Sequence, residues 1–320
     1  GTSLTTSPPI RWLGSGCPGG SHTDSTATGS APRPGPFRGN RRRAPGTSVI
    51  PWGPEVIELS SAGELACDFS ALPGTAIVVG GTGGIGSEIV RTLAARGSRV
   101  AFTYHRNEHK AAELAGAVGS GSDVATRRLD MSDADAVRQV VSSLAEQAGA
   151  VHTVVYSAGV HVPMRHLSTV EPDRFRHQID TDAGGFFNLV AAALPYLRSA
   201  HGSVVAVTTA ATRRFAVRDG LSVAPKAAIE ALVRGIAAEE GRFGVRANCV
   251  GPGMLVDGNA ERLIADGDLD DRALEAARRN TPLRRFGCAT DIAEAVCFLA
   301  SPRAEFITGQ KLDVDGGYGV

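Results

Sequence analysis

The feature that most constrains this chain is a glycine-rich stretch between an apolar β-branched run and a helix with an apolar stripe. Residues 75–79 read TAIVV and predict a buried strand, and the residues that follow read GGTGGIG. Gly80, Gly84 and Gly86 therefore fall in the turn and at the start of the helix, which Gly97 ends. A tight turn, a close approach to a pyrophosphate and close helix packing each need a residue without a side chain, and the helix N-terminus adds N–H donors. This order of elements predicts a nucleotide site.

The alternation of strand and helix continues along the chain. Short β-branched runs predict buried strands at residues 75–79, 99–104, 153–159 and 202–209. Apolar residues recur at helical spacing in two stretches, Ile85, Ile89 and Leu93, and Ile229, Leu232, Val233 and Ile236. This alternation predicts an α/β fold with a doubly wound parallel sheet that helices cover on both faces.

The first 70 residues differ from the rest in composition. They are rich in Gly, Pro, Ser and Thr and show no hydrophobic period. Such a stretch cannot bury enough apolar surface to offset the entropy lost on ordering. We expect residues 1–70 to be a disordered tail and residues 71–320 to form the folded domain.

Composition limits the classes of function. Hydrophobic residues make up 42% of the chain, which supports a sizeable core, and 33 Lys plus Arg balance 33 Asp plus Glu. The charge therefore indicates neither a nucleic-acid partner nor an anionic membrane, and no apolar run is long enough to span a bilayer. Five scattered cysteines without a CxxC pair predict no metal site and no disulfide framework, and they fit a reduced, cytoplasmic setting.

The end of the second predicted strand bears on the choice of dinucleotide. An acidic residue there would hold the ribose hydroxyls and repel a 2′-phosphate. The sequence instead has Tyr104, His105 and Arg106 at this corner. Because a guanidinium pairs well with a phosphate, the corner favours NADP(H) over NAD(H), although Arg106 could also be a solvated surface residue.

From about residue 74 to residue 320, the chain resembles the short-chain dehydrogenase/reductase family. The resemblance rests on the glycine spacing, on Asp130 in RRLDMSD, on YSAG at 156–159 where the family has NNAG, and on VGPGML at 250–255. The C-terminal segment is similar to that of 3-oxoacyl-thioester reductases. The family implies a Rossmann-type domain with a seven-stranded parallel sheet, assembled as a tetramer or dimer. It also implies a set of cofactor-binding positions, namely Gly80, Thr82, Gly84, Ile85, Gly86, Arg106, Asp130, Met131, Ser157, Ala158, Gly159, Lys226, Pro252 and Gly253.

The resemblance implies a catalytic set of Asn, Ser, Tyr and Lys, and this chain departs from it at three positions. Asp182 stands at the asparagine, Thr209 at the serine and Ser222 at the tyrosine, while Lys226 is unchanged. Thr209 carries the hydroxyl that would steady a carbonyl oxygen. Ser222 is a poor proton donor, since an aliphatic alcohol is much less acidic than a phenol with a pKa of about 10.

Several roles for these residues stay open from the sequence. Ser222 could instead cap the N-terminus of the helix that follows it. Asp182 could form a structural ion bridge with Lys226 or a proton relay with it. His161, and less readily His166, could reach the substrate as a general acid from the loop after the strand at 153–159. Arg213 and Arg214 could grip an anionic substrate tail or lie exposed.

Three functions follow from these alternatives. The first is an NADP(H)-dependent oxidoreductase that reduces a ketone or 3-oxoacyl-type carbonyl, with Lys226 and water, Ser222 or His161 as the proton source. The second is an enoyl- or dienoyl-thioester reductase, because an enolate needs a weaker acid than an alkoxide does. The family's 2,4-dienoyl-CoA reductases also have a serine at the tyrosine position, but Ala211 and Asp182 depart from their pattern. The third is a catalytically silent cofactor-binding subunit or sensor. In each case the partner is a small molecule and another copy of the chain.

Overall fold

The computed structural model describes residues 67–119, 124–159, 162–257 and 271–320. The chain divides into two units, residues 1–57 and 58–320, and every described residue belongs to the second. Most of the predicted tail, residues 1–70, therefore lies outside the described residues. Within the described part, Phe69 is already fully buried and stacks on the ring of His152 with 5.9 Å between centroids.

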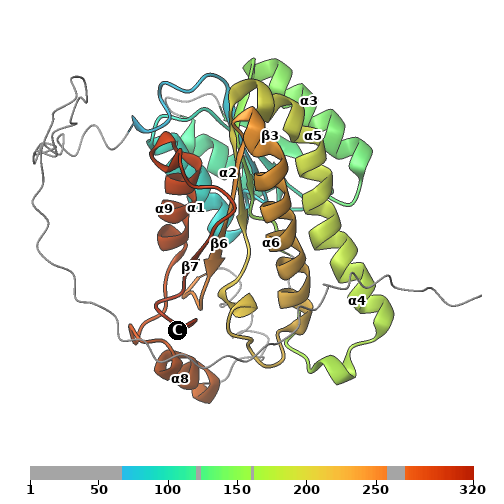
Figure 1. Cartoon of the computed structure of the whole chain (residues 1–320), viewed down its shortest axis with the longest axis vertical. Coiled ribbons are helices and arrows are strands. Elements are labelled where there is room, and N and C mark those ends of the chain that lie inside the picture. Colours follow the sequence, from blue (N-terminus) through green and yellow to red (C-terminus); the bar gives the residue numbers. More distant parts are fainter. Residues whose placement is uncertain (1–66, 120–123, 160–161, 258–270) are drawn as a thin grey trace, which may run out of the picture. The chain divides into compact units, whose positions relative to one another are not determined.

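One parallel sheet forms the centre of the described domain (Figure 1). Its strands lie in the order β3-β2-β1-β4-β5-β6-β7. They are β1 (Thr75–Val79), β2 (Val100–Tyr104), β3 (Val124–Arg128), β4 (Val151–Tyr156), β5 (Ser203–Val207), β6 (Arg246–Pro252) and β7 (Lys311–Val314). The predicted doubly wound sheet, with the seven strands that the family resemblance implied, is confirmed.

The strand order reverses between β1 and β4. From β1 the chain builds outward to β3, and it then returns to β4 beside β1 and builds outward to β7. In open α/β sheets, ligands bind beyond the carboxyl ends of the strands at such a reversal. The glycine turn follows β1 and the YSAG segment begins in the last residue of β4, so both lie at this point.

Helices cover both faces of the sheet (Figure 1). One face carries α1 (Gly84–Ala95), α2 (Glu108–Val118) and α9 (Ala289–Ala300), and the other carries α3 (Ala134–Ala148), α5 (Gly185–Ala200) and α6 (Gly220–Glu240). Two further helices, α4 (Pro172–Ile179) and α8 (Asp271–Asn280), lie toward the end of the sheet that also carries the C-terminus. None of the described helices combines the length and apolarity that crossing a membrane requires.

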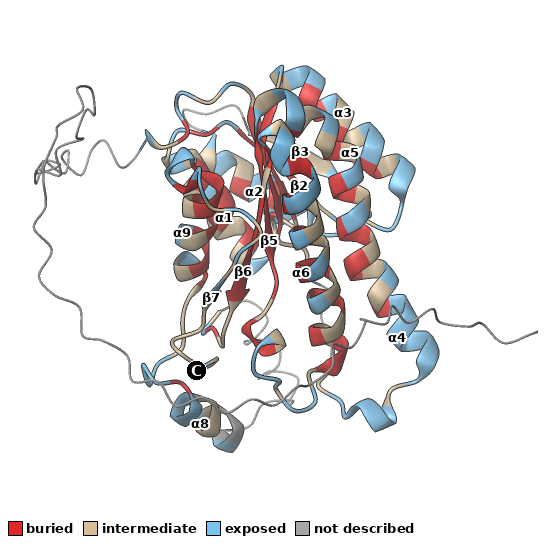
Figure 2. Cartoon of the chain, viewed as in Figure 1, coloured by how far each residue is buried: buried red, intermediate tan, exposed pale blue. Residues whose placement is uncertain are grey.

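The apolar stripes of the helices face the sheet. Ile89 and Leu93 of α1 are fully buried, as are Ile229 and Val233 of α6. Figure 2 shows the buried residues along the strands and on the inner sides of the helices, with exposed residues on the outer sides. The helical spacing read from the sequence is therefore confirmed, and two apolar layers hold the sheet between them.

Two strands end before their predicted limits. The strand predicted at 153–159 ends at Tyr156, and the one predicted at 202–209 ends at Val207. After β4, the Ser157 amide donates to the Val79 carbonyl at 3.0 Å, which brings the next residues against the glycine turn. After β5, Thr209 caps a short 3₁₀ turn at Ala210–Thr212. β-Branched residues favour strands, but threonine also occurs in turns, where its hydroxyl can bond to the backbone. The pattern alone therefore overestimates the length of these strands.

Candidate active site

The glycine turn after β1 is closed by backbone atoms. Gly80 has φ +80°, and a Cβ added there would lie 2.8 Å from the backbone N and Cα of Ala158. A Cβ at Gly86 would overlap the carbonyl oxygen of Gly80. Only glycine fits these two positions, because the contacts exclude a side chain at both and the positive φ disfavours one at Gly80 as well. The turn therefore presents bare backbone and the N-terminus of α1, as the predicted nucleotide site requires.

The other residues predicted in this turn have less constrained surroundings. Gly84 is the first residue of α1. Ile85 is half-buried and packs against the apolar layer of α1, α2 and α9. Thr82 is half-exposed within the turn.

A basic corner lies at the carboxyl ends of β2 and β3. His105 follows β2 and pairs with Asp130 at 3.6 Å from Nε2 to Oδ2, and Arg106 next to it is exposed. The pKa of Asp130 is lowered, first by the hydrogen bond from the Ser132 amide, then by the Ser132 hydroxyl, and to a smaller extent by His105 and Arg106. Met131, which follows Asp130, accepts a hydrogen bond on its carbonyl from Asn188. The predicted residues Arg106, Asp130 and Met131 thus stand at one edge of the site.

The last two predicted cofactor positions stand at the end of β6. Pro252 is the final residue of the strand, and the Gly253 amide donates to the Val314 carbonyl at 3.0 Å. A Cβ on Gly253 would lie 2.6 Å from Cα of Asp315. This junction, like the turn after β1, needs a residue without a side chain.

Lys226 and Asp182 form a buried ion pair. Lys226 Nζ lies 3.0 Å from Asp182 Oδ1, and the two residues are only 8% and 3% exposed. The same ammonium donates to the Ala158 carbonyl at 3.3 Å. The contact that the sequence left open between Asp182 and Lys226 is therefore made, and it lies beside the YSAG segment.

A third residue of this group was missed by the sequence reasoning. Tyr156, the last residue of β4, donates from its hydroxyl to Asp182 Oδ1 at 2.9 Å and lies within 3.0 Å of the Asp182 carbonyl. Its ring centre is 5.2 Å from Lys226 Nζ. Burial, followed by the charge and hydrogen bond of Asp182, raises the pKa of Tyr156 well above its usual value, so this phenol stays neutral. The signal was present in YSAG, where an aromatic residue stands at the first asparagine of the family's motif.

A local irregularity of the backbone carries Asp182. The segment Asp180–Gly184 is one π-helical turn that links α4 to α5. Such turns are rare and occur frequently at functional sites. Here the turn carries the carboxylate of Asp182 that reaches Lys226 of α6 and Tyr156 of β4.

The two hydroxyl residues of the predicted set stand on different elements. Thr209 follows β5, and its Oγ1 accepts from the Ala211 amide at 3.2 Å. Ser222 is half-buried in the first turn of α6, one turn before Lys226. The interpretation of Ser222 as the N-cap is wrong, because α6 begins earlier and its N-cap is Asp219. Burial raises the pKa of Asp219 to about 6, and the neighbouring Ser222 side chain opposes the rise.

The remaining candidates are distributed around the site. His161 lies outside the described residues. His166 is exposed before a short 3₁₀ turn at Leu167–Thr169. Arg213 and Arg214 are both exposed, and Arg214 donates to the Tyr318 carbonyl at 3.0 Å with its guanidinium 4.9 Å from the Tyr318 ring centre. Arg214 therefore contacts the C-terminal segment.

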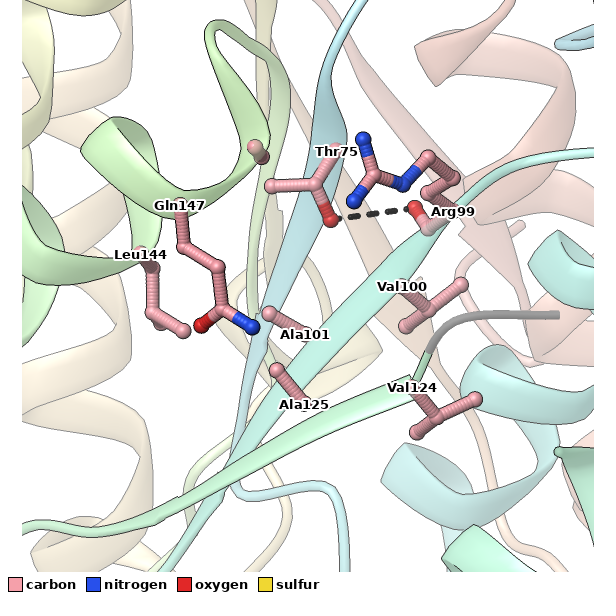
Figure 3. Close-up of a pocket in the computed structure, with 9 residues that line it drawn as sticks. Thr75, Arg99, Val100, Ala101, Val124, Ala125, Leu144 and Gln147 are labelled. Carbon is pink, nitrogen blue, oxygen red and sulfur yellow. Dashed lines mark hydrogen bonds between the residues drawn. The ribbon is translucent and has the colours of Figure 1, made fainter.

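A small cavity of about 150 Å³ lies at the opposite end of the sheet (Figure 3). It is lined by the first residues of β1, β2 and β3 and by the end of α3. Thr75 donates there to the Arg99 carbonyl at 3.2 Å. Because the predicted site residues stand at the carboxyl ends of the strands, this cavity is separate from the candidate active site.

Sequence comparison finds matching proteins along nearly the whole described domain. A family model described as enoyl-(acyl carrier protein) reductase matches residues 80–319. The 3-oxoacyl-(acyl-carrier-protein) reductase FabG of Staphylococcus aureus is 31% identical over 245 residues, which are 76% of this chain and 97% of that protein.

Solved structures share the fold. A short-chain dehydrogenase from Burkholderia cenocepacia in complex with NADP has a TM-score of 0.71 and 28% identity, and the match covers 78% of this chain and 100% of that one. Carveol dehydrogenase from Mycobacterium avium in complex with NAD has a TM-score of 0.72 and 25% identity, over 78% of this chain and 98% of that one. The reversal of strand order, the glycine turn beside it and these matches lead to one conclusion: the chain belongs to the short-chain dehydrogenase/reductase family of NAD(P)-dependent oxidoreductases.

Proposed function

We propose that this oxidoreductase uses NADP(H) to reduce a ketone or 3-oxoacyl-type carbonyl. The observation that carries the proposal is the position of Ala158. Its backbone packs against Gly80 of the glycine turn, and its carbonyl accepts the hydrogen bond from Lys226. One residue thus joins the cofactor turn to the buried lysine, so the two belong to one site.

The residues present fit a dinucleotide. Gly80 and Gly86 let the turn close on bare backbone, and the first turn of α1 offers N–H groups and the positive end of the helix dipole to a pyrophosphate. When bound, the cofactor would supply the hydride. Lys226 would hold the nicotinamide ribose, the role that the family resemblance implies, while Asp182 fixes its ammonium.

The residues around the reacting carbonyl have separate tasks. The Thr209 hydroxyl would donate to the carbonyl oxygen, and the Lys226 ammonium would add positive charge near the negative charge that develops there. Asp182 and the Ala158 carbonyl keep the ammonium from moving, since a buried charge with two fixed partners has little conformational freedom, and Tyr156 fixes the Asp182 carboxylate in turn. This arrangement needs a proton source besides Tyr156, whose hydroxyl is buried and already donates to Asp182.

The preference for NADP(H) rests on the corner after β2. Arg106 is exposed and His105 stands beside it, with Asp130 on the neighbouring strand end as their acidic partner. A 2′-phosphate would meet positive charge here, and a guanidinium binds phosphate with paired hydrogen bonds. The Burkholderia relative was solved with NADP and the Mycobacterium relative with NAD, so the family accepts both dinucleotides.

Binding and turnover test the proposal together. We would titrate the purified protein with NADPH and NADH by fluorescence, and then follow NADPH oxidation with acetoacetyl-CoA, a simple ketone and crotonyl-CoA. Tighter binding of NADPH and oxidation with the two carbonyl substrates are expected. Binding without oxidation on any substrate would refute the proposed reaction and support a silent cofactor-binding subunit.

Reduction of a conjugated double bond is the second candidate. The matching family model is described as an enoyl-(acyl carrier protein) reductase, and Ser222 is a weak acid that would suffice for an enolate. Oxidation of NADPH with crotonyl-CoA, without oxidation in the presence of acetoacetyl-CoA, would favour this candidate.

The proposal also includes a homo-oligomer, a dimer or a tetramer. Phe187 of α5 is 57% exposed, and an apolar ring on a long helix is suited to a contact between copies of the chain. Light scattering during size-exclusion chromatography measures the mass in solution. A monomeric mass at micromolar concentration would refute this part of the proposal.

A further inference from the structure

We propose that a largely buried network of polar side chains positions the Thr209 hydroxyl for the carbonyl reduction proposed above. The network consists of Lys311, Glu230 and Thr212, none of which a sequence motif indicated. The inference rests on the proposed function, in which Thr209 donates to the carbonyl oxygen. The three residues act through Thr209, so they are positioning residues.

The network begins at the turn that Thr209 caps. Thr209 precedes the 3₁₀ turn Ala210–Thr212, and its Oγ1 accepts from the Ala211 amide at 3.2 Å. A hydroxyl has one proton to donate and two lone pairs that accept, so this contact orients Oγ1 and leaves its proton for a substrate oxygen. The direction of the Thr209 hydroxyl therefore depends on where the turn places the Ala211 amide.

Thr212 closes the same turn and ties it to α6. Its Oγ1 lies 3.2 Å from the Thr209 carbonyl oxygen and 2.9 Å from Glu230 Oε1, so its one proton has an acceptor on either side. Glu230 stands four residues after Lys226 and is 8% exposed. Residues four apart lie on one face of a helix, so the turn is anchored to the same side of α6 as the lysine.

The charged end of the network comes from β7. Lys311 Nζ lies 3.2 Å from Glu230 Oε1 and 2.9 Å from Asp313 Oδ1, and it donates a hydrogen bond to Thr212 Oγ1. Each of the three protons of the ammonium thus has a partner within reach, and the lysine side chain is only 17% exposed. Hydrogen bonds to charged groups are stronger than those between neutral groups, so the Thr212 hydroxyl is held firmly between an ammonium and a carboxylate.

The end of β6 leaves room for this network. Gly251 pairs with Asp313 across the sheet, and a Cβ on Gly251 would overlap Asp313 Oδ1 and lie 2.6 Å from Lys311 Cε. Pro252, one of the predicted cofactor residues, follows directly. The end of β6, the helix α6 and the turn after β5 therefore meet at the network, and each carries a residue of the candidate active site.

This meeting point fixes two groups relative to one another. In the proposed reaction, the Thr209 hydroxyl and the Lys226 ammonium both serve one carbonyl oxygen. A displacement of about 1 Å at a reacting centre can slow a reaction about 100-fold. Loss of the network should therefore slow the chemical step and leave NADPH binding unchanged, since the glycine turn belongs to other elements.

The test compares threonine variants that differ by one group. Thr212→Val keeps the shape of the side chain and removes the hydroxyl, whereas Thr212→Ser keeps the hydroxyl. Thr92→Val is the matched control, because Thr92 is a half-buried threonine on α1 whose hydroxyl donates to the Glu88 carbonyl at 2.8 Å. NADPH oxidation with the best carbonyl substrate would be followed as a single turnover, with enzyme in excess over NADPH, so that slow product release does not hide the chemical step. NADPH affinity and thermal unfolding would be measured alongside.

Thr212→Val should oxidise bound NADPH about 10- to 100-fold more slowly than the wild type, with the same NADPH dissociation constant. Thr212→Ser should restore most of the rate, and Thr92→Val should leave it unchanged. The decisive comparison uses Thr209→Val as a background. Adding Thr212→Val to Thr209→Val should bring no further loss of rate, because the network acts only through the Thr209 hydroxyl. A purely structural role would slow the reaction equally in both backgrounds.

The charged part of the network is tested in the same way. Lys311→Met removes the cation between two carboxylates, and it should slow the reaction in the wild type but not in the Thr212→Val background. If Lys311→Met fails to fold, Glu230→Gln makes the same test, because it keeps the size of the side chain and leaves Lys311 paired with Asp313. An equal loss of rate with and without the Thr212 hydroxyl would overturn the role of the charged residues.

Different failures have different meanings. With an active wild type, an unchanged rate in Thr212→Val would overturn the network and leave the proposed function standing. The same holds if Thr212→Val slows the reaction equally in the wild type and in Thr209→Val. No oxidation of bound NADPH by the wild type on any carbonyl substrate would refute the proposed function, and the positioning role with it.

Discussion

The two halves of the site differ in what fixes them. In the cofactor half, around the turn after β1, backbone approaches backbone, and Gly80 and Gly86 have no room for a side chain. In the reaction half, on α6 and β4, side chains fix one another: Lys226, Asp182 and Tyr156 form one buried group. The fit at the two glycines is steric, whereas the fit among the three side chains is one of charge and hydrogen bonding.

The difference shows which constraint tolerates change. A steric requirement for glycine has no alternative, because every other residue adds a Cβ. A requirement for charge balance can be met by different residues, provided that each buried polar atom finds a partner. The Asp182 carboxylate finds two partners here, since it pairs with Lys226 and accepts a hydrogen bond from Tyr156.

The largest effect is expected from a substitution that breaks the buried group of the reaction half. Lys226→Met would leave the Asp182 carboxylate buried without its cation, and we expect the free energy of unfolding to fall by about 3–5 kcal/mol. Adding Asp182→Asn to this variant should restore much of the loss, because the uncompensated charge is then gone. Urea unfolding measures both. If the free energy of unfolding of Lys226→Met alone were within about 1 kcal/mol of the wild-type value, the ion pair would contribute little to stability.

A second prediction concerns the pH dependence of stability. The folded pKa of Asp219, about 6, is above its ordinary value of 3.8, so its stabilising contribution is present below pH 4 and is lost as pH rises through 6. Asp219→Asn removes this loss. At pH 8 its free energy of unfolding should exceed that of the wild type by up to about 3 kcal/mol, so it should unfold at a higher urea concentration. At pH 4 the two should unfold alike. A variant less stable than the wild type at pH 8 would contradict the shift.

The cofactor half is tested by a pair of glycine substitutions. Gly86→Ala forces a Cβ onto the Gly80 carbonyl, and it should cost about 1–3 kcal/mol of stability and weaken cofactor binding. Gly116→Ala in α2 meets nothing within 4 Å and should stabilise the protein by about 0.5–1 kcal/mol. Thermal unfolding of each variant without NADPH measures its stability, and the shift on adding NADPH measures its cofactor binding. Equal effects would mean that the turn relaxes around a methyl group.

Tyr156→Phe tests how firmly the side chains of the reaction half fix one another. It removes one donor to the Asp182 carboxylate but keeps the ring that packs on Phe186. We expect a loss of about 1–2 kcal/mol and a lower kcat with little change in NADPH affinity, since Asp182 keeps Lys226 but holds it less firmly. Steady-state kinetics and urea unfolding together measure this. An unchanged kcat would limit Tyr156 to a packing role.

The smallest expected effect is at the exposed edge of the cofactor half. Arg106→Ala removes a charge that no buried partner holds, and it should weaken NADPH binding about 10-fold, or about 1.4 kcal/mol, without changing NADH binding. Fluorescence titration with both cofactors gives the ratio. Equal losses for NADPH and NADH would show that Arg106 does not contact the 2′-phosphate.

Much of the fold and of the cofactor half could be predicted from sequence. The β-branched run at 75–79 became β1 with the same bounds, and the stripe of Ile89 and Leu93 became the buried side of α1. These predictions hold because periodicity and the need for glycine are local properties of the chain. The C-terminal ends of β4 and β5 were predicted too late in the sequence, because contacts with neighbouring elements decide where these strands end.

The reaction half needed the tertiary structure. Tyr156, Asp182 and Lys226 come from a strand, a π-helical turn and a helix that are far apart in sequence, and only the folded sheet brings them within hydrogen-bonding distance. Likewise the sequence offered Ser222 as a helix cap, but the helix begins at Gly220 and the cap is Asp219.

By itself, then, the sequence determined the doubly wound sheet and the place of the nucleotide turn, since both follow from residue types at fixed local spacing. Only the tertiary structure decided which side chains share their protons and charges. Whether an aspartate is solvated, paired with Lys226 or half-buried at the start of α6 depends on what chain segments from elsewhere pack around it.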